Sequence, residues 1–277
     1  MLSTGGGGYV PDFLRVSVEL PAPAGSTILL DYTHISIRLR AARRLAVVAA
    51  VNINGSELVP LAREGIWHFD TRVPRNVQAG PEVYQNNDLD RGHLVRRLDP
   101  VWGDETTART ANQDTFTYSN AAPQASDFNQ GVELWRGLED HVLNHAEQYD
   151  ARISVFTGPV LADDDLPYRG VQIPRKFWKI AVWTTEGQLA AAGFLLDQSP
   201  LLGKEELARA ITERLLADEP PPLGPFRTFQ VPVRQISALS GMPLTQLEDA
   251  DRFIASPNGP RPDSNAMLLT DTAQIRL

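Results

Sequence analysis

An almost uninterrupted apolar run, LAVVAAVNI at residues 45–53, most limits the folds open to this chain. Its length and its β-branched and small side chains are typical of a central strand in a sheet. Residues 34–40, just before it, alternate apolar and polar side chains as a half-buried strand does. The Asn-Gly dipeptide at 54–55 favours a tight turn and predicts a hairpin. The core of the expected fold is therefore a sheet.

The remaining pattern mixes strands and helices without regular alternation. Further strands are expected after a docked loop near residue 9 and at residues 66–73, 89–95, 115–119, 152–160, 176–185, 189–196 and 226–233. Helices are expected at residues 106–113, from Asp127 or Asn129 onward, at 204–216, and in a short segment closed by Gly241. Such a mixture predicts the α+β class.

Length and composition favour one globular unit. The 277 residues, 42% hydrophobic and 22% charged, suffice for one large domain or two small ones, and neither an internal repeat nor a domain boundary is visible. We therefore expect a flexible glycine-rich N-terminus at residues 1–8, a single domain at 9–255 and a loose tail at 256–277.

Several classes of protein and site are excluded. No apolar stretch reaches eighteen residues and no signal peptide is visible, so we expect no membrane span and a cytoplasmic protein, or a secreted one whose leader was removed. The absence of cysteine excludes disulfides, thiolate ligands and a cysteine nucleophile.

The net charge of −8 argues at first sight against a polyanionic partner. Clustered bases matter more than the sum, however, and arginines crowd the central third of the chain.

Residues 90–139 gather the side chains that carry chemistry. They hold the tetrad Asp-Arg-Gly-His at 90–93, two asparagines, one glutamine and one glutamate: Asn120, Asn129, Gln124 and Glu139. An imidazole, a guanidinium, neutral amides and a carboxylate are the groups needed to cut a phosphodiester with one hard metal ion.

The order of these motifs resembles that of a known family. DRGHLVRRLDPVWG, TFTYSNAAPQ and FNQGVELWRGLED follow one another as in the DNA/RNA non-specific endonucleases, the ββα-metal or His-Me finger nucleases. The matching blocks cover about sixty residues, and the strand pattern is compatible from residue 9 to 253. In many relatives the metal-binding asparagine precedes the helical glutamate by eight positions, whereas Asn129 precedes Glu139 by ten.

The resemblance implies a fold and an activity. The fold would be a central antiparallel sheet flanked by helices, with a ββα-metal finger that presents His93 against Asn129. The activity would be Mg²⁺-dependent cleavage, with Mn²⁺ as a possible substitute, of double- and single-stranded DNA and of RNA with little sequence preference. A catalytically inactive nucleic-acid-binding module of the same fold is the alternative. A small zinc element is disfavoured, because cysteines and paired ligand histidines are missing.

His93 is the expected general base, because a neutral imidazole can take a proton from water near neutral pH. The other four histidines, His34, His68, His141 and His145, are interpreted as structural. The resemblance makes Asn129 the metal ligand, although an asparagine at a helix start can also be a cap. A neutral amide ligand leaves the full charge of the cation available to the phosphate.

The remaining site residues have two interpretations each. Arg91 shares a strand face with His93 and could clamp a phosphate, or it could form a surface ion pair. The resemblance gives Asn120 a role in supporting the catalytic loop, where the alternative is turn chemistry, and gives Gln124 a similar role. Glu139 could contact a water of the metal or serve as the acid for the leaving group, or it could lie on a solvated helix face.

Substrate contacts and partners complete the expectations. The candidate substrate contacts are Arg91, Arg96, Arg97, Gln124 and Arg72. An upstream arginine that contributes in many relatives is either Arg63 or Arg72. An inhibitor or gating partner is expected if the protein stays inside the cell, and a homodimer is possible. The tryptophans are interpreted as core or rim residues.

Overall fold

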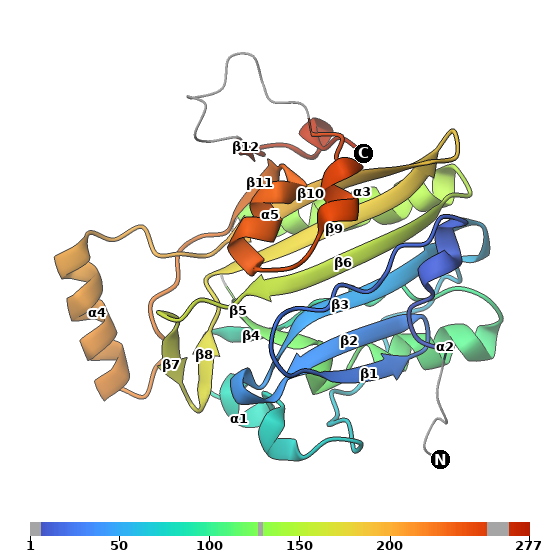
Figure 1. Ribbon diagram of the computed structural model, residues 1–277. Coiled ribbons are helices and arrows are strands. Elements are labelled where there is room, and N and C mark those ends of the chain that lie inside the picture. Colours follow the sequence, from blue (N-terminus) through green and yellow to red (C-terminus); the bar gives the residue numbers. More distant parts are fainter. Residues whose placement is uncertain (1–6, 127–129, 254–265) are drawn as a thin grey trace.

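The centre of the molecule is one eight-stranded sheet in which every neighbouring pair is antiparallel (Figure 1). The computed structural model describes residues 7–126, 130–253 and 266–277. In spatial order the strands are β1 (Ile28–Tyr32), β2 (Ile35–Arg40), β3 (Leu45–Asn54), β6 (Arg152–Val160), β9 (Lys176–Thr185), β10 (Gln188–Asp197), β11 (Arg227–Val231) and β12 (Met267–Leu268).

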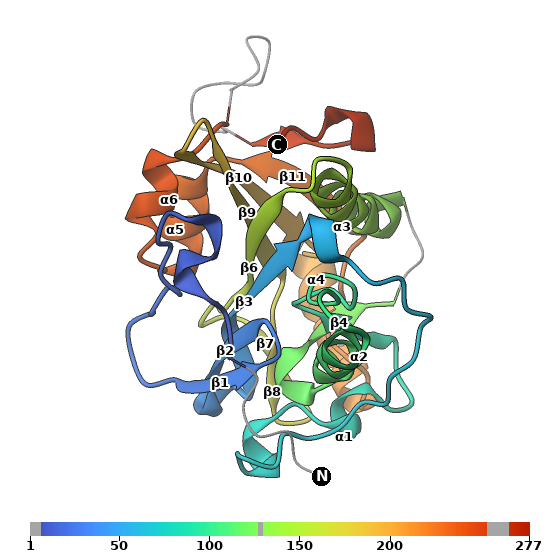
Figure 2. The same cartoon turned by 90° about the vertical axis from the view of Figure 1, so that its right-hand side faces the viewer.

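Each face of the sheet has its own apolar core. On one face lies α3 (Gln130–Gln148), which packs Leu138 and Val142 against the sheet. On the other face lie η1 (Pro11–Leu14), α5 (Val233–Ser240) and α6 (Thr245–Asp249). Figure 2 shows the sheet between these two layers. Because both faces are covered, the central strands are apolar almost throughout, as β3 with its ten buried residues illustrates.

A smaller unit beside the sheet carries the tetrad. Strand β4 (Leu89–His93) pairs antiparallel with β5 (Ala121–Ala125), so that His93 lies opposite Ala121. Helix α2 (Glu105–Asp114), capped by the Asp104 side chain, lies in the connection between the two strands. After β5 the chain enters α3, which completes the ββα arrangement.

The remaining elements are short, apart from one projecting helix. They are η2 (Ala41–Arg43), η3 (Gly55–Glu57), η4 (Arg75–Val77), α1 (Pro81–Tyr84), η5 (Tyr118–Asn120), β7 (Leu166–Tyr168), β8 (Val171–Ile173) and η6 (Thr272–Gln274). Helix α4 (Lys204–Leu216) stands away from the sheet and buries none of its residues (Figure 1). Among the described helices, none combines the length and the apolarity that crossing a membrane requires.

The α+β class and the antiparallel sheet flanked by helices are confirmed, as are most long elements. Strands β2, β3, β6, β9 and β10 and helices α2, α4 and α5 occupy the expected segments. Gly241, in the left-handed conformation with φ 66°, ends α5 as expected. These segments have the strongest periodicity or the clearest caps, which explains their agreement.

Three short segments differ from the expectation. The Asn54-Gly55 dipeptide leads into η3, because β3 pairs with β2 and β6 instead of with the next segment of the chain. Residues 66–73 form only an isolated bridge at His68. The second strand of the ββα unit is 121–125, not 115–119, since Thr115 and Thr117 turn inward as buried loop residues.

The end of the expected loose tail is packed. Strand β12 pairs with β11, and Leu269 and Ile275 are buried. Residues 254–265, which include the start of that tail, and residues 1–6 lie outside the described part of the chain.

Candidate active site

His93 lies at the end of β4 and lines a cavity of about 310 Å³ between the β4–β5 pair and α3. The cavity is rich in arginine and has one carboxylate. Its lining is Arg63, His93, Arg96, Arg97, Leu98, Gln124, Trp135, Arg136, Glu139 and Phe226. Four guanidinium groups against one carboxylate make the cavity suitable for an anion.

Aromatic rings hold the His93 imidazole. The Trp67 ring lies 4.6 Å away, centroid to centroid, and Phe116 meets the imidazole edge-on at 5.0 Å. The imidazole Nε2 is buried and has no hydrogen-bond partner among the described residues. A buried polar atom without a partner is uncommon in a folded protein, so Nε2 calls for a partner that the described residues do not supply.

The surroundings of His93 favour its neutral form. Burial, together with the positive charges of Arg63 and Arg97, lowers the pKa of His93 to about 3. The imidazole is therefore unprotonated at neutral pH, as a general base must be before it acts. An anion bound between the arginines would offset their charge and raise this pKa.

Gly92 and Gln124 fit together across the β4–β5 pair. The Gln124 side chain lies over Gly92 so closely that a Cβ at position 92 would overlap its carboxamide. The glycine of the tetrad thus leaves room for an amide that lines the cavity. Gln198 in turn fixes β5, since its Oε1 accepts a hydrogen bond from the Ala125 amide at 3.0 Å.

Asn120 supports the backbone that follows His93. Its Oδ1 accepts a hydrogen bond from Val95 N at 2.9 Å, and its Nδ2 donates to Val95 O and Thr115 O at 3.0 and 2.9 Å. The residue is fully buried and does not line the cavity. It acts through the loop and not by touching a ligand there.

The two consecutive arginines after the tetrad differ in their partners. Arg96 donates to the Glu139 carbonyl oxygen at 2.9 Å and forms an ion pair with Asp140, which ties the loop to α3. Arg97 donates to Leu61 O, Ala62 O and Asn112 Oδ1, all neutral acceptors. Among the described residues Arg97 therefore has no acidic partner to offset its charge at the cavity, whereas Arg96 is tied to α3.

Arg91 is exposed, and its guanidinium lies 5.8 Å from the centre of the Trp67 ring. Neither Asp88 nor Asp90 forms an ion pair with it among the described residues. It is not part of the cavity lining, so any ligand contact of Arg91 would lie at the rim.

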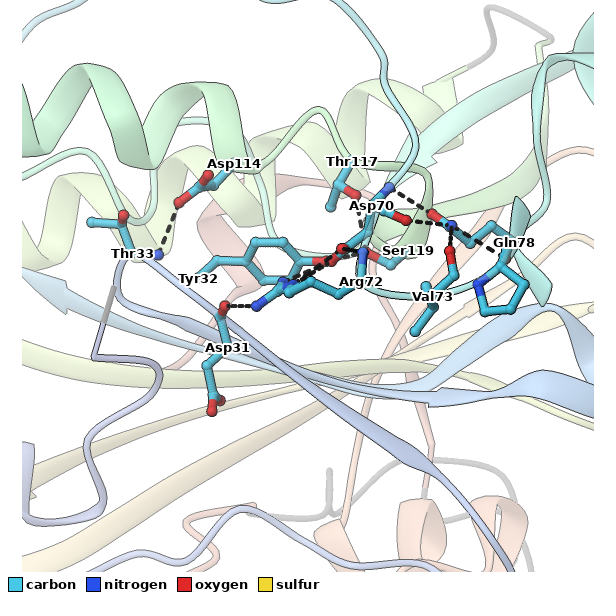
Figure 3. A network of polar contacts seen from close by, with 11 residues as sticks. Asp31, Tyr32, Thr33, Asp70, Arg72, Val73, Gln78, Asp114, Thr117 and Ser119 are labelled. Carbon is cyan, nitrogen blue, oxygen red and sulfur yellow. Dashed lines mark hydrogen bonds and ion pairs between the residues drawn. The ribbon is translucent and has the colours of Figure 1, made fainter. Parts of the chain in front are cut away.

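The structure separates the two upstream arginines. Arg63 lines the cavity with His93. Arg72 lies elsewhere, where its Nη2 donates to Asp70 Oδ2 at 2.6 Å and its Nη1 donates to Asp31 O at 2.8 Å (Figure 3). This geometry favours Arg63 over Arg72 as the upstream phosphate contact.

The polar network in Figure 3 instead stabilises η5, the segment that contains Asn120. The Tyr32 hydroxyl donates to Asp70 Oδ2 at 2.6 Å and lies 2.7 Å from Ser119 Oγ, next to Asn120. Burial alone would raise the pKa of Asp70, but hydrogen bonds from Arg72 and Tyr32 outweigh it and lower the pKa. Arg72 thus keeps a buried carboxylate ionised beneath η5.

Glu139 reaches the cavity from α3. Its carboxylate Oε1 lies 3.2 Å from Nζ of the buried Lys179, and the carboxylate side chain is 14% exposed. Nearby, burial raises the pKa of Asp99 to about 7, although Lys179 and Arg96 counteract that effect. Glu139 is consequently neither a solvated surface residue nor an isolated acid.

The expected metal ligand, Asn129, lies outside the described residues, immediately before the start of α3 at Gln130. Within the described part of the chain, no three His, Asp or Glu side chains gather in a way that could hold a metal ion. A multi-ligand metal cage is thus absent from that part of the chain.

Sequence reasoning missed Arg136, Trp67, Asp99 and Lys179. Arg136 comes one turn before Glu139 on α3, so helical spacing could have indicated it. Lys179 interrupts the apolar pattern of a central strand, which was a visible signal. Trp67 and Asp99 approach the site only through tertiary contacts.

The buried Asp99 and His93 should make the free energy of unfolding depend on pH in opposite directions. Asp99 binds a proton more tightly when folded, so its contribution to stability falls as pH rises from about 4 to about 7. His93 binds one less tightly, so its contribution falls as pH drops from about 6.5 towards about 3.

Asp99→Asn should therefore gain stability relative to the wild type as pH rises from 4 to 7, by up to about 1.4 kcal/mol per pH unit. Denaturant unfolding at several pH values measures this, with Asp163→Asn at an exposed position as the control. A pH-independent difference for Asp99→Asn would contradict the assignment.

Comparison with known proteins agrees with the geometry. A protein of Sinorhizobium fredii, the uncharacterized protein y4fB, is 37% identical over 277 residues, which cover 91% of this chain and 41% of that protein. Human mitochondrial endonuclease G is 29% identical over 192 residues, covering 65% of this chain and 56% of its own length. The chain thus spans about half the length of these curated relatives.

The fold has also been seen in a solved structure. A chain in the crystal structure of the EndoG/EndoGI complex superposes with a TM-score of 0.58 over 85% of this chain and 91% of that chain, at 15% identity. The family model for DNA/RNA non-specific endonucleases matches residues 15–251, from just after η1 to the end of α6. The chain belongs to the DNA/RNA non-specific endonuclease family.

Proposed function

We propose that this protein is a metal-dependent endonuclease that hydrolyses phosphodiester bonds in DNA and RNA. The observation that carries the proposal is His93 in the wall of a cavity lined by four arginines, with a buried Nε2 that has no hydrogen-bond partner among the described residues. The arginines suit a phosphate, and the imidazole suits a water beside it. Membership in the family supports the same reaction.

His93 acts in this proposal as the general base that takes a proton from the attacking water at Nε2. The phosphate lies among Arg63, Arg97 and Arg136, with Arg91 at the rim. As the phosphate enters, its charge offsets that of the arginines and raises the proton affinity of His93. Substrate binding thus strengthens the base where it is needed.

Little sequence preference follows from the groups involved. Guanidinium groups contact phosphate oxygens, which are the same in every nucleotide, whereas sequence is read at base edges. The proposed substrates are therefore double- and single-stranded DNA as well as RNA. Gln124 lies above Gly92 at the cavity wall, where it can position either phosphate or water.

A hydrated divalent cation, Mg²⁺ or Mn²⁺, fits the donors present. The described part of the cavity offers a carboxylate and a carboxamide but no cage, and Mg²⁺ commonly keeps several waters and few protein ligands. Asn129 is the proposed ligand on the family pattern. When bound, the cation would offset the charge that develops on the phosphate and the leaving oxygen.

Glu139 is proposed to contact the water around that cation or to protonate the leaving oxygen. Asn120 supports the loop after His93 by its three backbone hydrogen bonds. The inactive module of the same fold remains the alternative, and an intact His93 with a free Nε2 disfavours it.

Biological context extends the proposal. A nuclease kept inside a cell would need an inhibitor or a gating partner, and the structural relative was solved in the EndoG/EndoGI complex. We propose that such a partner would cover the arginine-lined cavity. A homodimer and a site of action in the cytoplasm or outside the cell stay predictions, as does the single domain at 9–255.

His93→Ala is expected to lose cleavage by a factor of about 10²–10⁴, because the general base is removed while the arginines remain. Plasmid nicking with purified full-length protein and Mg²⁺ measures this. His141→Ala, on α3 but outside the cavity, is the matched control and should cut at the wild-type rate. Wild-type cleavage by His93→Ala would overturn the mechanism, and an inactive wild type with Mg²⁺ and with Mn²⁺ would favour the inactive module.

Arg63→Ala and Arg72→Ala should separate catalysis from stability. Arg63→Ala is expected to reduce kcat/KM by roughly 10²–10³ with little change in Tm, because a phosphate contact is lost. Arg72→Ala should lower Tm, because buried Asp70 loses its partner, and should keep most activity below the melting range. The opposite pattern would make Arg72 the phosphate contact.

Removal of the metal should abolish cleavage without unfolding the protein. The described residues contain no metal cage on which folding could depend. A thermal melt with and without chelator is therefore expected to show nearly the same Tm, while plasmid cleavage stops. Asn129→Ala should match the chelated protein in activity. A large fall in Tm on chelation, or full activity in Asn129→Ala, contradicts the single-ligand proposal.

A further inference from the structure

A fully buried lysine occupies the middle of the central sheet. Lys179 belongs to β9 and is 2% exposed. It lies on the same strand face as Phe177 and Ala181, which both belong to the core beneath α3. On the neighbouring strand β10 it is paired with Phe194, another core residue. An apolar side chain would be the ordinary choice at this position.

The lysine amine is directed at the candidate active site. Its Nζ lies 3.2 Å from Glu139 Oε1 and 5.7 Å from the centre of the Trp135 ring. Both partners belong to α3 and both line the cavity that contains His93. Lys179 itself does not line the cavity, but through its ion pair the sheet contacts the carboxylate that does.

Stability gives no reason for this ion pair. Taking two charges out of water costs several kcal/mol per ion, and replacing a buried pair by apolar residues is often neutral or stabilising, as a general rule. A methionine would fill the same space beside Phe177 without that desolvation cost. The lysine therefore calls for an explanation outside the packing of the core.

The charge of Lys179 acts on two carboxyl groups. Its amine contacts Glu139, and Asp99, buried in the loop after β4, feels the positive charge of Lys179 as well as the negative charge of Glu139. An unpaired Glu139 would be free to change rotamer towards solvent or towards the cavity arginines, Arg63, Arg97 and Arg136. With Lys179 in place, Glu139 Oε1 is held.

We propose that Lys179 is a positioning residue that holds the Glu139 side chain in place at the wall of the cavity that contains His93. The effect of Lys179 on catalysis rests on the proposed function, whereas its effect on the position of Glu139 does not. It gives the central sheet a direct part in the active site, through a residue that contacts neither phosphate nor water.

A double-mutant cycle tests the catalytic part. Lys179→Met keeps the length of the side chain and removes its charge, and Glu139→Gln removes the charge of its partner. We expect Lys179→Met to lower kcat by roughly 10–100-fold with KM little changed, as loss of an orienting partner does. In the Glu139→Gln background the same change should have almost no further effect. Additive losses, or wild-type kcat in Lys179→Met, would overturn the proposal.

Lys176→Met, on the same strand but only half-buried, is the matched control and should leave kcat unchanged. Thermal melts check that each variant folds. Lys179→Gln offers a second replacement that can still donate a hydrogen bond to Glu139 and should restore part of kcat. If neither Lys179 variant folds, the lysine serves the core and the proposal fails.

A crystal structure of Lys179→Met decides the positioning part without any activity. The Glu139 side chain is expected to leave its wild-type place or to adopt several rotamers. An ordered Glu139 in the wild-type position would overturn the inference even if the enzyme is active. Conversely, a wild-type protein that cuts no nucleic acid refutes the proposed function alone, and the displaced Glu139 would still establish the role of Lys179 in the structure.

Discussion

The site depends on the pairing of β4 with β5 and on the side chain of Asn120, which fixes the chain just beyond that pair. The strand register places His93 opposite Ala121, and the Asn120 amide binds the backbone of Val95 on both its N–H and C=O groups. Two segments separated by α2 are thereby joined at the histidine. If this connection were loosened, the imidazole would lose its relation to Arg97 and to α3.

Around this frame, charges fall into two groups. Two of the arginines that line the cavity, Arg63 and Arg97, lack acidic partners among the described residues, and they act on His93. Other charges are paired: Arg96 with Asp140, Arg72 with Asp70, and Lys179 with Glu139. The paired charges hold loops and helix in place, while the unpaired charges are available to an anion. One residue type thus has two uses, set by its partners.

Much of the fold followed from local pattern. The apolar run of β3, the long strands β6, β9 and β10, and the caps of α2 and α5 carry their own signals. The strand after Asn120 did not, because Ala-Ala-Pro-Gln resembles a loop until β4 is there to pair with it. The expected strand at 66–73 does not form, because that segment has only a single β-bridge to a neighbouring segment.

Site residues that belong to sequence motifs could be predicted, whereas those that reach the site only through tertiary packing could not. His93, Gln124 and Glu139, which the motifs singled out, line one cavity, but the family resemblance could not distinguish Arg63 from Arg72. The distinction depends on Asp70, which recruits Arg72 into a network with Tyr32 and Ser119. Long-range partners of this kind leave no periodic signal in a sequence.

The proposed mechanism depends on a neutral His93 imidazole beside an arginine-lined anion site. An NMR titration of the His93 ring in the full chain, with and without inorganic phosphate, measures its protonation. In the free protein the pKa of His93 is expected far below the usual 6.5, because of burial and the nearby arginines, and a higher pKa is expected when phosphate is bound. A pKa near 6.5 that phosphate leaves unchanged would refute this mechanism.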